Sequence, residues 1–186
     1  MSVVLSLCMI LSFFPIFKMP LGGSINLGEA VPIIFFSLKY GHKAGVNIGI
    51  LYGILKIFIS FNLPPTQSFL CFFIVILFDY ILPYAFLGFS PFFTFKISNV
   101  NVSFAIIIFL SGLVKLVSTV FSGIYVWKQY VPSGELIFPF VLLYNLSYIL
   151  PQSIINLILC FVIDKIFVKS RLALLENIHL RSYRQL

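Results

Sequence analysis

The feature that most constrains this chain is a series of long apolar stretches that contain almost no charge. Segments such as "FFIVILF" (72–78) and "AIIIFL" (105–110) do not alternate apolar and polar residues, as the strands of a membrane β-barrel would. Hydrophobic residues make up 61% of the 186 residues and charged residues 9%, too few polar side chains to cover a soluble fold of this size. Because backbone groups in a bilayer must bond within their own segment, the sequence predicts an all-α integral membrane protein.

Short stretches rich in Gly, Pro, Asn and Lys divide the chain into six apolar segments. We expect six transmembrane helices within 1–17, 29–40, 42–61, 66–93, 103–128 and 135–168. The second segment is shorter than the roughly 20 residues that cross a bilayer upright, so we expect it to tilt or to lie partly within the bundle. Residues 1–168 then form one transmembrane domain, and the basic tail 169–186 is expected at the inner headgroup surface.

The distribution of cations predicts the orientation. An even number of spans places both termini on one side, and the opposite side holds only Lys18 and Lys128. Since cytoplasmic loops carry an excess of Lys and Arg, we expect a multi-pass protein of the plasma membrane with both termini cytoplasmic. The net charge of +7 then reflects topology and gives no reason to expect a nucleic-acid partner. The cations assigned to the cytoplasmic side are Lys39, Lys43, Lys96, Lys165, Lys169, Arg171, Arg181 and Arg184.

Few residues could carry catalysis or bind a metal. The three cysteines lie far apart in apolar stretches, without the spacing of a metal site or a disulfide set, and no Walker or HExxH motif occurs. An intramembrane enzyme would need a nucleophile with a base, or paired acids, yet both histidines fall in a predicted loop and the tail, and no second acid is expected at the depth of Asp79. We therefore expect neither an enzyme nor a bound cofactor or metal.

Asp79, in "LFDYILPYAFLG" (77–88), is a carboxylate within an apolar run. A mid-span carboxylate costs a few kcal/mol to insert and usually faces a cavity or a partner. One interpretation is a structural ion pair with Lys115 or Lys56, and the other is a ligand pocket. Lys56 taken alone is interpreted as a side chain that snorkels from near the outer end of the third segment.

A polar and aromatic cluster falls at the outer ends of the last two segments. Thr119, Gly123 and Trp127 recur every four residues and therefore share one helical face. An interfacial aromatic belt is one interpretation of this cluster. A gap at Gly beside a Trp, with Asp and Asn available, instead favours a flat, polar or cationic heterocycle as ligand. The sixth segment contributes Phe140, Tyr144, Asn145 and Tyr148.

Over residues 2–168 the chain resembles the thiamine-specific substrate-binding (S) components of energy-coupling factor (ECF) vitamin transporters. The resemblance is carried by "MPLGGSINLGEAVPIIFFSLKYGHKAGVNIGILYG" (19–53), "FDYILPYAFLG" (78–88) and "KLVSTVFSGIYVWKQYVPSGELIFPFVLLYNLSYILP" (115–151). It implies a six-helix S-component fold that binds one vitamin near the extracytoplasmic surface, under the loop after the first helix. It also implies docking onto a transmembrane T component with two ATPase subunits.

The resemblance implies roles for individual residues. Trp127 falls on the family's stacking Trp and Asn145 on its binding Asn, whereas Thr119 stands where members often have His and Phe140 where they often have Tyr. These two departures leave open another vitamin, a thiamine precursor such as the aminopyrimidine alone, or a structural membrane subunit that binds nothing small. The predicted substrate-binding set is Asp79, Tyr80, Thr119, Gly123, Trp127, Phe140, Tyr144 and Asn145. Ser2 and Ser6 match the small-xxx-small surface by which the first helix docks the T component.

Overall fold

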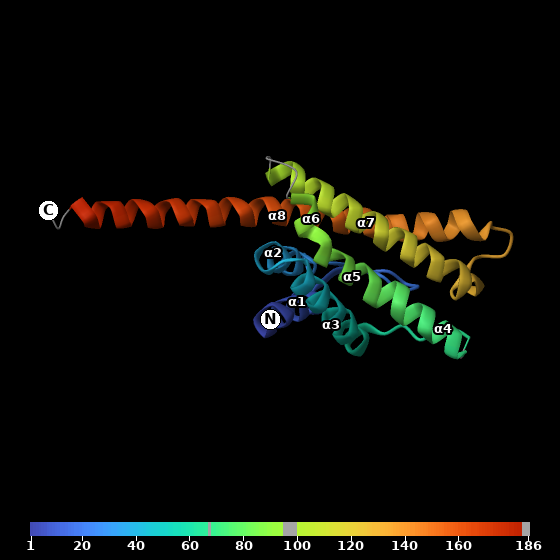
Figure 1. Ribbon diagram of the computed structural model, residues 1–186. Helices are drawn as coiled ribbons and strands as arrows, with labels where there is room; N and C mark the ends of the chain where they lie inside the picture. The colour runs from blue at the N-terminus through green and yellow to red at the C-terminus, as the bar shows by residue number, and fades with distance from the viewer. Residues whose placement is uncertain (67, 95–99, 184–186) are drawn as a thin grey trace.

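The computed structural model describes the backbone of residues 1–66, 68–94 and 100–183, and the side chains of 1–66, 68–93 and 101–166. The chain forms a bundle of helices with one small hairpin (Figure 1). Lys96 and the side chains of the predicted tail, which contributed to the charge count above, lie outside the described residues.

The elements follow the six predicted segments in order. They are α1 (Ser2–Phe13), β1 (Pro15–Lys18), β2 (Ser24–Asn26), α2 (Val31–Tyr40), α3 (His42–Ser60), α4 (Phe69–Ile74), η1 (Val75–Ile81), α5 (Leu82–Phe86), η2 (Leu87–Phe89), α6 (Ser90–Thr94), α7 (Val100–Tyr125), η3 (Lys128–Tyr130) and α8 (Ile137–Tyr183).

The described residues form the all-α membrane fold that the sequence predicted. Four helical stretches are long and apolar enough to cross a bilayer, namely 42–60, 69–93, 101–125 and 137–166, and α1 and α2 are shorter apolar helices. One expected helix end was wrong, because α1 stops at Phe13 and Pro15 begins a strand instead. Proline lacks a backbone N–H and restricts the residue before it to extended conformations, which explains the break. At the other end α8 passes the expected boundary at 168 without interruption and continues to Tyr183.

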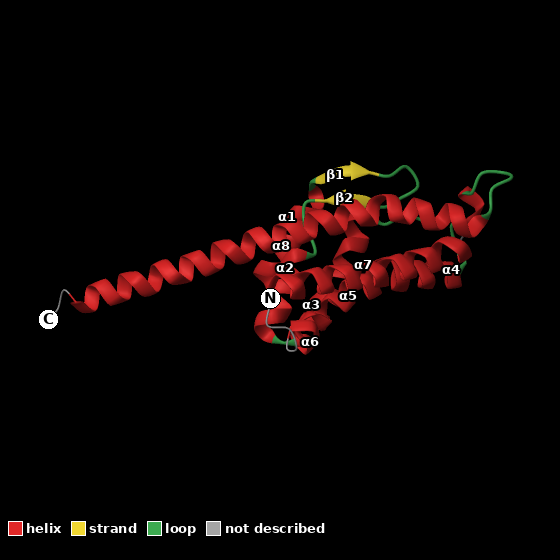
Figure 2. Ribbon diagram, turned by 90° about the horizontal axis from the view of Figure 1, so that it is seen from above, coloured by secondary structure: helices red, strands yellow, loops and turns green. Residues whose placement is uncertain are grey.

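The hairpin of β1 and β2 connects α1 to α2 and includes residues 15–17, which were expected to be helical. The strands pair antiparallel, with Lys18 opposite Ser24, and the turn between them contains Gly22 and Gly23 at φ angles of 98° and 88°. L-residues with a side chain rarely adopt such angles, so glycine suits both positions. Figure 2 shows the hairpin alongside α8, where the Gln152 carboxamide accepts from the Asn26 N–H and donates to the Asn26 carbonyl.

The fourth apolar segment is a helix of changing pitch. It passes from α4 through the π-helical turns of η1, the short α5 that carries Pro83 in its first turn, and η2. Single π turns inside α-helices often occur at functional sites. Here the π turns position Asp79 and Tyr80, both of which belong to η1.

Glycines let α3 lie directly against the α5–η2 stretch. Gly45, Gly49 and Gly53 recur every fourth residue on α3 and therefore share one face. A Cβ at Gly49 would overlap the carbonyl of Tyr84, and a Cβ at Gly88 would overlap the backbone of α3. This is the small-xxx-small packing of membrane helices, and its pattern is visible in the sequence.

Both chain ends lie at the same end of the bundle, whereas the connections from α3 to α4 and from α7 to α8 lie at the other end (Figure 1). An even number of crossings produces this arrangement. The side of the membrane on which the ends lie remains a prediction.

We predict that Gly49→Ala lowers the free energy of unfolding by about 1–3 kcal/mol, the usual cost of overpacking, because the new methyl overlaps backbone atoms that cannot rotate away. Gly112→Ala is the matched control, since its Cβ would meet only the Ser153 Oγ, at 3.1 Å. Thermal unfolding of both purified variants in the same detergent measures the difference. Equal melting temperatures would contradict the close α3–α5 packing.

Candidate functional site

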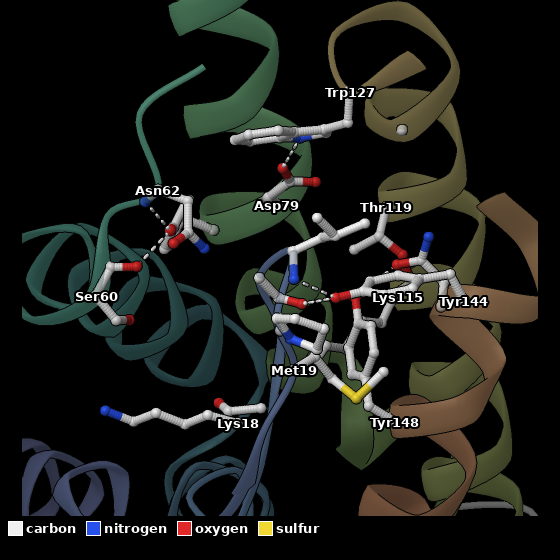
Figure 3. Close-up of a pocket in the computed structure, with 18 of the residues that line it drawn as sticks. Lys18, Met19, Ser60, Asn62, Asp79, Lys115, Thr119, Trp127, Tyr144 and Tyr148 are labelled. Carbon is white, nitrogen blue, oxygen red and sulfur yellow. Dashed lines mark hydrogen bonds between the residues drawn. The ribbon is translucent and has the colours of Figure 1, made fainter. Parts of the chain in front are cut away.

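A cavity of about 400 Å³ lies between the hairpin turn, the end of α3, η1, α7 and the start of α8. That volume is within the range of small-molecule sites. Figure 3 shows its lining side chains converging from these separate elements. The structure brings to this one cavity every residue predicted to bind substrate, namely Asp79, Tyr80, Thr119, Gly123, Trp127, Phe140, Tyr144 and Asn145.

Asp79 lies on the cavity wall beside Trp127. Its Oδ2 accepts from the Ser122 hydroxyl at 2.9 Å. The same oxygen accepts from the Trp127 Nε1 at 3.3 Å (Figure 3). Among the described residues neither Lys115 nor Lys56 forms an ion pair with Asp79, so the structural ion pair considered from the sequence is absent. Oδ1 has no protein hydrogen bond in the described part of the chain, which leaves it available to accept from a ligand.

Trp127 follows the end of α7 and is held in place from two directions. Its backbone N–H donates to the Gly123 carbonyl at 3.2 Å, and its ring stacks near Tyr130 at a centroid distance of 6.1 Å. Gly123 has a second role that the sequence did not reveal, because a Cβ there would overlap the Val141 side chain on α8. The missing side chain therefore lets α8 approach α7 next to the indole.

Two tyrosine hydroxyls organise the rim of the cavity. Tyr144 Oη accepts from the Leu21 N–H and donates to the Gly22 carbonyl, both at 2.9 Å, and so holds the hairpin turn against α8. Tyr80 Oη donates to the Ser60 carbonyl at 2.6 Å and accepts from the Asn62 N–H at 3.1 Å. Both hydroxyls therefore hold backbone segments in place, and the two tyrosine rings line the cavity.

Asn145 is oriented by its own helix. Its Nδ2 donates to the Val141 carbonyl at 2.8 Å, and its Oδ1 accepts from the Tyr148 hydroxyl at 2.6 Å. An amide has two donor hydrogens and two acceptor lone pairs, so one of each remains for a ligand. Tyr148, noted in the sequence but not assigned a role, fixes this orientation.

The two positions that depart from the family pattern offer little polarity. The Thr119 hydroxyl donates to the Lys115 carbonyl of its own helix at 2.9 Å, and Phe140 stacks near Tyr144 with a centroid distance of 6.3 Å and an interplanar angle of 18°. Both side chains line the cavity, where they contribute mainly shape.

Glu29 is the main residue that the sequence reasoning missed. It is 2% exposed and lines the cavity. Its carboxylate pairs with Lys56 Nζ at 2.6 Å and accepts from the hydroxyls of Tyr52 at 2.8 Å and Tyr84 at 2.6 Å. A second acid, which the sequence reasoning did not expect near Asp79, therefore lines the same cavity.

Lys56 was also misinterpreted. Its side chain is 8% exposed, and its ammonium donates to Glu29 and to the Ser12 hydroxyl, so it does not snorkel. A buried carboxylate attracts a buried cation because each compensates the desolvation of the other. A lysine late in an apolar helix and an acid directly before the "AVPII" run (30–34) were the available signals.

No cluster of three His, Cys, Asp or Glu side chains close enough to hold a metal ion occurs among the described residues. Of the three free cysteines, Cys8 and Cys160 are buried and Cys71 is half-buried. Carboxylate, amide, ammonium, hydroxyl and aromatic groups line the cavity.

The chain is similar in sequence and in fold to known proteins. The family described as thiamine transporter protein (Thia_YuaJ) matches residues 1–172. The thiamine transporter ThiT of Bacillus subtilis (strain 168) is 30% identical over 155 residues, which cover 77% of this chain and 76% of that protein. The solved structure of ThiT from Listeria monocytogenes superposes with a TM-score of 0.61 over 90% of each chain, and at 18% identity it shows a shared fold. The chain therefore belongs to the thiamine transporter protein family.

Proposed function

We propose that this chain is the thiamine-binding S component of an ECF-type importer. It binds thiamine in the cavity at the extracytoplasmic side and delivers it through a T component and two ATPase subunits. The observation that carries the ligand assignment is the Asp79 carboxylate oxygen that no described residue bonds to, beside the Trp127 ring in a cavity of about 400 Å³. Family membership supports a transport protein rather than an enzyme.

The chemistry of thiamine matches these groups. Its aminopyrimidine offers an exocyclic amino donor and its thiazolium carries a positive charge. Asp79 Oδ1 accepts from the amino group, a charge-assisted hydrogen bond that contributes about 1.5–3 kcal/mol. Trp127 stacks on the ligand and adds roughly 0.5–2 kcal/mol of ring and cation–π attraction. Asn145 supplies its remaining donor and acceptor, and the hairpin turn covers the ligand from above.

A precursor that holds only the aminopyrimidine is the second candidate. Two positions favour this candidate. The Thr119 hydroxyl bonds within its own helix, and Phe140 has no hydroxyl. Fewer polar groups of the protein would then contact the thiazolium ring of thiamine. Competition between thiamine and the isolated aminopyrimidine for the same site distinguishes the candidates, because thiamine binds more tightly only if its thiazolium half also makes contacts.

The partner surface is assigned to α1. Ser2 and Ser6 are exposed and one helical turn apart, and Ser12, buried in the Lys56 network, belongs to the far end of the same helix. Small side chains permit a partner helix to approach closely. The exposed serine stripe lies at the end of the bundle that carries the chain termini (Figure 1), which supports a T-component contact at the cytoplasmic side.

We predict that Asp79→Asn weakens thiamine binding about tenfold or more. The substitution keeps the shape but removes the charge, and 1.4 kcal/mol corresponds to a factor of ten. Quenching of Trp127 fluorescence, from the single Trp of the chain, measures the affinity in detergent. Asp164→Asn is the matched control, since Asp164 does not line the cavity. Saturation by the aminopyrimidine but not by thiamine would overturn the thiamine assignment.

We predict that Ser6→Trp abolishes uptake by cells but leaves thiamine binding by the isolated subunit unchanged. The indole prevents close helix contact at α1, whereas the cavity belongs to other elements. Val117→Trp, at a position that is 68% exposed on α7, controls for a bulky residue facing lipid. Normal uptake by Ser6→Trp would remove the docking role from this face.

We predict that a cysteine introduced at Ser133 reacts with a membrane-impermeant maleimide from outside intact cells, whereas one at Ser182 reacts only after lysis. Ser133 is exposed in the connection between α7 and α8, at the end of the bundle opposite the termini (Figure 1). Both substitutions are made with Cys8, Cys71 and Cys160 replaced by Ala. The reverse labelling pattern would contradict cytoplasmic termini.

A further inference from the structure

The hairpin places against the cavity one buried polar side chain that the function proposed so far does not use. Asn26, the last residue of β2, is 2% exposed and lines the cavity. Successive residues of a strand face opposite sides, and Ser24 and Asn26 line the cavity whereas Ile25, between them, does not. The Asn26 carboxamide therefore belongs to the cavity-facing side of the hairpin, an element that contributes nothing to the binding set predicted from the sequence.

The side-chain oxygen of Asn26 has no hydrogen-bond partner among the described residues. It is the one buried side-chain oxygen or nitrogen atom in that part of the chain that bonds to no other group. Other buried amides of the protein are bonded, since Asn145 accepts from Tyr148 and Asn156 accepts from Gln152 at 3.0 Å. Buried polar atoms are nearly always bonded, and an unbonded one destabilises a fold. The cavity that Asn26 faces provides a physical reason for the exception.

The backbone of Asn26, in contrast, is fully bonded. Its N–H donates to the Gln152 side chain, and its carbonyl accepts from the same side chain and from the Gly28 N–H at 2.8 Å. A polar group on a fixed backbone loses little conformational freedom when a ligand binds to it. The Asn26 oxygen is therefore pre-organised on the hairpin and does not require the strand to move.

The chemistry of the atom defines its partner. An amide oxygen accepts hydrogen bonds and does not donate them, so the partner carries an N–H or an O–H. Asp79 Oδ1, which no described residue bonds to, is also an acceptor on the cavity wall. A ligand that satisfies both oxygens carries at least two donor hydrogens. Thiamine meets this requirement, because its exocyclic amino group has two N–H bonds and its side chain has one O–H.

We propose that Asn26 is a ligand-binding, specificity-determining residue of the hairpin, whose carboxamide oxygen accepts a hydrogen bond from an N–H or O–H donor of the ligand. This inference rests on the proposed function. A ligand with a single donor leaves one buried acceptor of the site unbonded and binds more weakly for that reason. The number of donor hydrogens then adds to ring stacking as a criterion of selection.

The test replaces Asn26 by Leu, which keeps the branched outline of the side chain and removes its oxygen. Trp127 fluorescence measures the thiamine affinity, and thermal unfolding measures the stability of the ligand-free protein. Thiamine binds to Asn26→Leu about three- to tenfold more weakly, the loss expected for one neutral hydrogen bond. The melting temperature does not fall, because an apolar group replaces a buried polar atom that had no partner. Asn26→Val, with a smaller side chain that suits a strand, is measured in the same way.

Two asparagines elsewhere in the chain serve as controls. Asn156 is 8% exposed, does not line the cavity and is bonded to Gln152. Asn156→Leu therefore lowers the melting temperature, since it leaves a buried donor without its acceptor. Asn47 is exposed on α3 and lies outside the cavity. Asn47→Leu keeps the wild-type thiamine affinity.

The inference is wrong if thiamine binds to Asn26→Leu and Asn26→Val as tightly as to the wild type. A melting temperature below that of the wild type in both variants also overturns it, because the oxygen then already has a partner in the ligand-free protein. Weaker binding without a loss of stability supports the inference.

Repeating the titrations with the isolated aminopyrimidine identifies the donor. A loss of affinity for both ligands assigns the amino group to Asn26, and a loss for thiamine alone assigns a donor in the other half of the molecule. If the wild type binds neither ligand, the proposed function is wrong and the inference with it. That result is obtained without any variant, so it is distinguishable from a failure of the inference alone.

Discussion

The buried pair of Glu29 and Lys56 is the interaction on which the rest of the structure depends. The Glu29 carboxylate accepts from Lys56 and Tyr52 of α3 and from Tyr84 of α5, and Lys56 reaches across to Ser12 of α1. Removing one partner of such a pair costs about 3–5 kcal/mol, because the other charge stays buried alone. Three helices and the segment before α2 are therefore fixed to one another at one depth.

The Glu29–Lys56 pair also determines which charged groups the cavity presents. With the Glu29 charge neutralised within the protein, Asp79 and Lys115 are the charged groups of the inner wall that remain open to a ligand among the described residues. Tyr84 connects the two levels, since its hydroxyl bonds to Glu29 while its ring supports Lys115. Under the proposed function, substrate selection is thus a problem of charge placement as much as of cavity volume.

The sequence predicted the helical membrane fold because six apolar runs and their breaks are local signals. It also predicted that Thr119, Gly123 and Trp127 gather at one place, since a four-residue spacing puts them on one face regardless of tertiary contacts. The remaining roles, such as that of Tyr80, followed only from the family resemblance. Glu29 and Lys56 could not be predicted as a pair, because they are 27 positions apart and only the packing of the first three helices brings them together. The hairpin was missed for a related reason, as its β2 strand of 3 residues is stabilised by a side chain 126 positions away.

The bond between Gln152 and Asn26 has a consequence for how the hairpin meets other polypeptides. A strand edge with unpaired N–H and carbonyl groups is a template on which another polypeptide can add a strand and begin aggregation. Both backbone groups of Asn26 are occupied by one carboxamide, which takes the place of a residue in a third strand. Helix α8 thereby blocks the outer edge of β2 at Asn26, so that a neighbouring copy cannot add a strand on this side of the hairpin.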